Sequence, residues 1–146
     1  MNGATSDQRL REIVDAASPA TIDDVINIMQ SIESVLPNND GLKWFNFLYR
    51  IVTVAVRDHP PAEGWKNERW VKRLDVVFAM IYFRAIADFI KGAAIPSSWQ
   101  ALFEARHRAG IDRIQFALAG MNAHINHDST AVTRVHIFQA WPEGVA

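Results

Sequence analysis

The segment L-K-W-F-N-F-L-Y-R-I-V-T-V-A-V-R, residues 42–57, decides the fold. As a helix it would carry apolar side chains on nearly every face, with turn signals before it at residues 38–41 and after it at residues 59–64. A helix that is apolar nearly all round usually lies at the centre of its protein. The segment therefore predicts an all-α protein built around this helix.

Helix signals continue on both sides of this segment. Thr21 and Asp24 have the spacing of a capping box, apolar residues then recur at helical spacing, and Pro37 marks the stop. On the other side, Asn67 is a suitable N-cap for a long helix that ends near Gly92. These signals predict one helix before the central one and a long one after it.

The remaining helix start and stop signals complete a helical bundle. A further helix is expected to begin at Pro96 and to end at Gly110 as its C-cap, and Asp112 begins the next. Residues 1–20 are expected to form an N-terminal extension or helix, and residues 129–146 a short C-terminal tail. We therefore predict a single domain over residues 1–146, a compact all-α bundle of five or six helices.

The composition excludes several classes of protein. Of the 146 residues, 49% are hydrophobic and 21% charged, and the net charge of -1 carries no electrostatic footprint for nucleic acid or an anionic membrane surface. No cysteine is present, which excludes disulfides, iron–sulfur clusters and thiolate zinc sites. No signal peptide, membrane span, phosphate loop or dinucleotide fingerprint occurs. We expect a cytoplasmic protein without a cofactor.

The most informative polar cluster closes the stretch I-Q-F-A-L-A-G-M-N-A-H-I-N-H-D, residues 114–128. Positions three and four apart share a helix face, so His124, His127 and Asp128 would project together if the helix continues that far. Two imidazoles and a carboxylate can bind a metal, move a proton or hydrogen-bond one another. Ala117 and Gly120 leave room one turn earlier for a neighbouring helix or a ligand.

Asp75 is the only charged residue between Arg73 and Arg84 in an apolar helix, with Tyr82 seven residues on and on the same face. Carboxylates are rarely buried unless they are paired. One interpretation is an ion pair with an arginine of a neighbouring helix. The other is a general base or a metal ligand opposite His124.

A polar stripe also follows the central helix, at Asn46, Tyr49, Arg50 and Thr53. Arg50 fits a solvated face. Asn46 and Thr53 stand among aromatic and aliphatic neighbours, so they line either an interior polar cavity or the water-facing side.

Three chemical interpretations follow. A metal site would combine His124 with His127 or Asp128 and with Asp75, Glu104 or His59 from other helices. Acid–base catalysis on a small organic molecule would use His124 as proton shuttle and Asp75 or Asp128 as its partner. Five residues would bind the substrate in that case: Asn122, Tyr82, Asn46, Tyr49 and Gln115.

The third interpretation is a buried hydrogen-bond network in a non-catalytic protein that binds a ligand or associates with itself, as a homodimer for example. Five tryptophans supply aromatic surface for a pocket or a subunit contact. We favour the acid–base enzyme and expect neither a metal nor another cofactor.

Three motifs also resemble a known family. They are W-F-N-F-L-Y-R-I-V-T-V-A-V (residues 44–56), R-L-D-V-V-F-A-M-I-Y-F (residues 73–83) and the stretch of residues 114–128. Together they resemble an uncharacterised bacterial family, frequent in actinobacteria, that is classed as a domain of unknown function. The resemblance implies a role in specialised metabolism. It also implies an abbreviated C-terminal part, because Ser129 and Thr130 stand where members continue with Leu-Pro.

Overall fold

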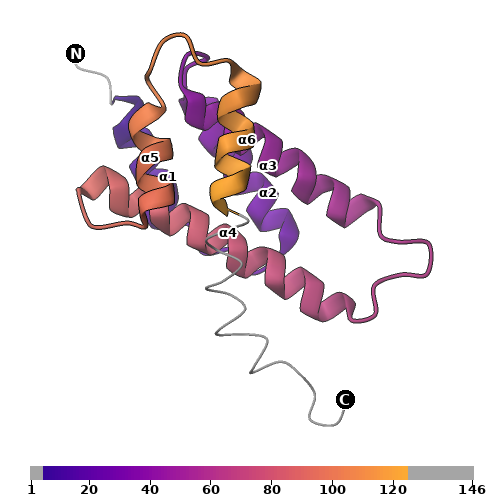
Figure 1. The fold of residues 1–146 in the computed structure, drawn as a ribbon. Helices are drawn as coiled ribbons and strands as arrows, with labels where there is room; N and C mark the ends of the chain where they lie inside the picture. Colours follow the sequence, from indigo (N-terminus) through magenta and orange to yellow (C-terminus); the bar gives the residue numbers. More distant parts are fainter. Residues whose placement is uncertain (1–4, 125–146) are drawn as a thin grey trace.

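The computed structural model describes residues 5–124, and this part of the chain is helical without a strand. Figure 1 shows the six helices of this part. They are α1 (Ser6–Ala16), α2 (Ile22–Val35), α3 (Gly41–Asp58), α4 (Glu68–Lys91), α5 (Ser97–Ala105) and α6 (Arg113–Ala123). The predicted all-α bundle is confirmed, and the N-terminal region contributes a helix to it.

Most helix ends follow the signals in the sequence. The hydroxyl of Thr21 accepts a hydrogen bond from the Asp24 N–H at 3.1 Å, which completes the predicted capping box of α2. Asn67 caps α4 in the same way, by accepting from the Trp70 N–H at 3.0 Å. Gly92 ends α4 with a φ of 76°, a left-handed conformation that glycine adopts without strain.

The predicted end of α5 at Gly110 is wrong. The helix ends at Ala105, and Gly110, with a φ of 83°, lies in the connection to α6. The cause is tertiary, because the carbonyl of Arg106 accepts a hydrogen bond from the Gly41 N–H at 2.8 Å. Arg106 is 3% exposed, and its side chain reaches the fully buried Asp40. These contacts stop the helix five residues before the glycine.

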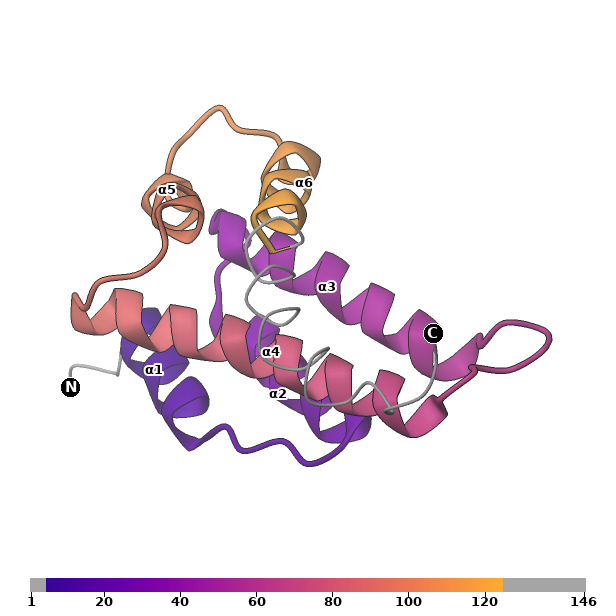
Figure 2. The same ribbon diagram turned by 60° about the horizontal axis from the view of Figure 1, so that its bottom comes forward.

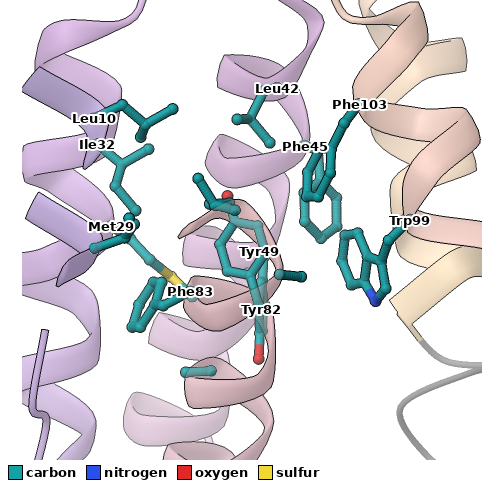
Figure 3. Packing of buried hydrophobic residues seen from close by; sticks show 14 of the residues in the cluster. Leu10, Met29, Ile32, Leu42, Phe45, Tyr49, Tyr82, Phe83, Trp99 and Phe103 are labelled. Carbon is teal, nitrogen blue, oxygen red and sulfur yellow. The ribbon is translucent and has the colours of Figure 1, made fainter. Parts of the chain in front are cut away.

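All six helices contribute to one continuous hydrophobic core. Figure 3 shows its centre, where side chains from α1 and α2 meet those of α3, α4 and α5. Its largest fully buried members are Trp99, Tyr82, Phe45, Phe83 and Phe103.

Helices α3 and α6 run side by side in both views (Figures 1 and 2). Their register is parallel, since Gly41 meets Phe116 and Phe45 meets Gly120. A Cβ on either glycine would lie 2.4 Å from the facing ring, which no packing tolerates. The space that the sequence leaves at Gly120 is therefore used for close helix packing.

The expectation that the central helix is not half exposed is wrong for α3. Its inner face is buried, but Phe47, Ile51 and Val52 on the outer side are 38%, 44% and 43% exposed. The inner face packs against α2 and α6, and nothing in residues 5–124 covers the outer one. Within the same residues, no helix is both long and apolar enough to cross a membrane.

Candidate functional site

The imidazole of His124 lies at the C-terminal end of α6, where α3, α4 and α5 converge on it, and it is 7% exposed. Aromatic rings surround it on several sides. The ring centroid of Tyr49 is 4.5 Å away, that of Phe78 is 5.3 Å away, and those of Trp99 and Phe45 are 6.2 and 6.4 Å away. The neighbouring rings come from three helices, so the position of His124 depends on the whole bundle.

Behind this ring cluster, Tyr82 and Asn46 form a buried hydrogen bond. The Tyr82 hydroxyl donates to Asn46 Oδ1 at 2.9 Å, and both residues are 0% exposed. Burial raises the pKa of Tyr82 well above its ordinary value, because a phenolate would lose its hydration there. Tyr82 is thus a neutral donor, and its hydrogen bond goes to the protein itself.

The same network continues to α2 and back to α3. Asn46 Nδ2 donates to the Met29 carbonyl at 2.8 Å and to Glu33 Oε2 at 3.4 Å. Glu33 in turn accepts two hydrogen bonds from the Arg50 guanidinium, and the hydrogen bond to Glu33 raises the pKa of Arg50. Arg50 therefore belongs to a half-buried ion pair and not to the solvated face predicted for it.

Asn46 and Thr53 are buried, as one of the two interpretations of the polar stripe requires. Their polar groups, however, are engaged inside the protein, because Thr53 Oγ1 donates to the Tyr49 carbonyl at 2.8 Å. Tyr49 is also buried, and its ring lies between those of Tyr82 and His124. Figure 3 shows Tyr49 and Tyr82 together at the centre of the core.

Asp75 differs from these residues because one of its oxygens lacks a partner. Its Oδ2 atom is buried and makes no hydrogen bond, and no ion pair joins Asp75 to any arginine of residues 5–124. The predicted ion pair is therefore absent from this part of the protein. Burial raises the pKa of Asp75 to about 6, since nothing compensates the carboxylate for lost hydration.

Asp75 and His124 are linked only through Phe78 among the contacts of residues 5–124. Phe78, one turn after Asp75 on α4, packs its ring edge-on against His124 at 5.3 Å. Neither a hydrogen bond nor an ion pair between Asp75 and His124 occurs, although both residues are described. The half-buried Asp75 thus lies one helical turn from the ring that packs against His124.

Two of the proposed substrate-binding residues lie elsewhere. Gln115 is exposed at the start of α6, where its side chain accepts a hydrogen bond from the Asp112 N–H at 3.1 Å. This contact completes a capping box, which explains the polar residue without a substrate. Asn122 is exposed on α6.

Part of the predicted metal site lies outside the described residues, namely His127 and Asp128. Glu104 and His59 are exposed, and Glu104 accepts a hydrogen bond from Gln100. Within residues 5–124, no three His, Asp or Glu side chains lie close enough together to share a metal ion.

Sequence reasoning overlooked three residues that matter here. Glu33 anchors both Asn46 and Arg50, but it stands on an amphipathic helix among exposed polar residues and carries no local signal. Phe78 could have been found, because it lies three residues after Asp75 and four before Tyr82. Arg106 follows an apolar run and resembles any exposed helix-end arginine.

Comparison with known proteins gives a family but no activity. Neither a curated protein nor a solved structure matches this chain. Residues 22–142 match the model of DUF5995, which is described as a family of unknown function. This match spans most of the 146 residues, including every helix except α1. The chain therefore belongs to the DUF5995 family.

Proposed function

We propose that this protein binds a small organic molecule between Asp75 and the ring cluster of His124, Phe78, Tyr49 and Trp99, and exchanges protons with it. One observation carries the proposal: the buried Asp75 Oδ2 atom has no hydrogen-bond partner. An unsatisfied buried acceptor costs about 1–3 kcal/mol, and proteins retain few of them. A ligand that donates a hydrogen bond would satisfy this oxygen.

The chemistry of the surroundings supports the same conclusion. A carboxyl group with a pKa of about 6 is part ionised near neutral pH, so it can both accept and return a proton. The rings around His124 offer an apolar wall on which a planar ligand could pack. In this proposal Asp75 is the general base, and His124 carries the proton on the other side of the ligand.

The roles of the other residues change accordingly. Tyr82 and Asn46 use their polar groups on each other and on α2, so we assign them to holding α3 and α4 in place. Tyr49 contributes its ring to the cluster, while Gln115 and Asn122 have no part in the proposed site. Asp128 and His127, outside the described residues, stay predictions.

Binding can be tested with arylalkylamines and benzylic ketones, which pair a ring with a hydrogen-bond donor or an acidic C–H. We would screen benzylamine and phenylacetone analogues by thermal shift against the wild type and Asp75→Asn. Asp88→Asn is the matched control, because Asp88 is a half-buried residue of the same helix. Compounds that stabilise the wild type and Asp88→Asn but not Asp75→Asn would support the proposal. Equal stabilisation of all three proteins would contradict it.

Catalysis needs a second measurement on any ligand that binds. Proton exchange predicts that an acidic C–H of the ligand exchanges with deuterium in D2O, as followed by NMR, and that the rate rises as pH increases through about 6. Asp75→Asn and His124→Gln should both abolish this exchange.

Binding without exchange would instead favour the alternative, a non-catalytic ligand-binding module, which the fully satisfied Tyr82–Asn46 network supports. A homodimer also stays a prediction, supported by the exposed Phe47 and Ile51 side chains. We further propose a cytoplasmic location, supported by the absence of cysteine.

A further inference from the structure

A separate cleft lies at the end of the bundle where α2 begins, α3 ends and α4 begins. Figures 1 and 2 show these three helix ends close to the α3–α4 connection. The cleft has a volume of about 740 Å³, within the range of small-molecule sites. None of the residues proposed above for proton exchange lines it.

The charges in this cleft do not balance. Four cationic side chains line it (Arg57, Arg69, Lys72 and Arg73) but only two carboxylates do (Asp23 and Glu68). Both carboxylates are already paired, Asp23 with Arg57 at 2.8 Å and Glu68 with Lys72 at 2.8 Å. The two remaining arginines are left without a counter-charge in the lining.

The side chains of Arg69 and Arg73 make no hydrogen bond or ion pair with any residue in the range 5–124. They are four residues apart on α4, so their side chains leave the same face one turn apart. A lone exposed arginine is ordinarily just solvated. Here two neighbouring guanidinium groups line one concave surface. Each can donate two parallel N–H hydrogen bonds, and this arrangement favours the binding of an oxyanion.

The rest of the cleft adds an apolar part. Ile22, Val76 and Val77 also line it, and Ile22 is buried against the core. A ligand that fits both the two arginines and this apolar lining carries an anionic group and a compact apolar group.

We propose that this cleft binds a small organic oxyanion, a carboxylate or a phosphate monoester, through Arg69 and Arg73. The apolar part of the ligand packs on Val76, Val77 and Ile22. Asp75 does not line this cleft, so the anion binding proposed here does not depend on the proposed proton exchange.

Phenyl phosphate, benzoate and inorganic phosphate are the probes, titrated into ¹⁵N-labelled full-length protein and followed by amide chemical shifts. We compare the wild type with the double variant Arg69→Gln/Arg73→Gln. Arg84→Gln is the matched control, because Arg84 is an exposed arginine of the same helix outside the cleft lining. Both arginines of the double variant are exposed and unpaired, so it should melt like the wild type.

We expect phenyl phosphate or benzoate to shift the amides at the start of α2 and in the first half of α4, and to bind more tightly than inorganic phosphate. The double variant should weaken this binding by at least about tenfold, whereas Arg84→Gln should leave it unchanged. Added salt should weaken it too. Equal affinity in the wild type and the double variant, or no saturable binding of any probe, would overturn the proposal.

Discussion

Asp75 shows how strongly burial alone can alter a side chain. Its pKa is raised to about 6 by lost hydration, with no charged partner contributing to the shift. The sequence drew attention to this residue because it is the only charge in the apolar stretch between Arg73 and Arg84. It could not say whether a neighbouring arginine would neutralise that charge, since the partner depends on how the helices pack.

The raised pKa predicts a specific dependence of stability on pH. In the folded protein Asp75 ionises less readily than in the unfolded chain, where its pKa is near 3.8. The unfolded state therefore binds fewer protons between these two values, and stability falls as pH rises from about 4 to about 6. Below this window Asp75 is neutral in both states and contributes nothing.

Asp75→Asn should remove this loss, since an amide carries no charge to desolvate. Its free energy of unfolding should match that of the wild type near pH 3.8 and exceed it increasingly up to about pH 6. At neutral pH the gain should be roughly 1 kcal/mol, after allowance for partial exposure. Urea denaturation across this pH range measures the difference. A constant difference between the two proteins at every pH would contradict the argument.

At the scale of the element, the contact between α3 and α6 depends on a missing side chain. Gly120 lies against the ring of Phe45, and a Cβ there would be 2.4 Å from Cδ2 of that ring. In an isolated helix Gly→Ala is favourable by about 1 kcal/mol, because alanine loses less backbone entropy. In this protein the higher helix propensity of alanine is opposed by the clash of its Cβ with Phe45.

We therefore expect Gly120→Ala to destabilise the protein by about 1–3 kcal/mol, because the helices must move apart to admit the methyl group. Such movement would also displace His124, which lies one turn further along α6. Thermal unfolding followed by circular dichroism measures the first effect, and the amide spectrum of α6 reports the second. An increase in melting temperature would show that helix propensity dominates and that the close contact is wrong.

At the scale of the whole molecule, one buried charge cluster joins segments distant in sequence. Arg106 at the end of α5 donates to Asp40 before α3 at 2.6 Å and to Asp7 of α1 at 2.9 Å. Burial by itself would lower the pKa of Arg106, but the hydrogen bonds and charge of Asp40 raise it above its ordinary value. The guanidinium therefore stays charged, and Asp40 and Asp7 stabilise this buried charge.

Asp40→Asn tests this dependence cleanly. An asparagine can still accept the hydrogen bond that Asp40 receives from the Leu42 N–H at 3.0 Å, so the cap of α3 survives and mainly the charge is lost. We expect a loss of about 3–5 kcal/mol in the free energy of unfolding, because Arg106 keeps only the half-exposed Asp7.

Asp15→Asn is the control for this prediction. Asp15 pairs with Arg11 and Lys91 at the surface, so its substitution should cost less than about 1 kcal/mol. Similar losses for the two variants in urea denaturation would mean that the buried cluster contributes no more than a surface pair.

The sequence by itself determined the helices, because their signals are local. Capping at Thr21 and Asn67, the glycine at Gly92 and the spacing of apolar residues act within a few residues and need no partner from elsewhere. The one helix end that was misjudged, at Gly110, is the one set by a distant contact, that of Arg106 with Asp40 and Gly41.

Only the tertiary structure decided which partners the polar residues have. It paired Asn46 with Tyr82, paired Arg50 with Glu33 and left one oxygen of Asp75 without a partner. Helical spacing shows which residues share a face, but not which face of another helix lies opposite. The free energy of a buried polar group depends on the partners that this opposite face offers. Those partners distinguish the structural network of Asn46 and Tyr82 from the candidate site at Asp75.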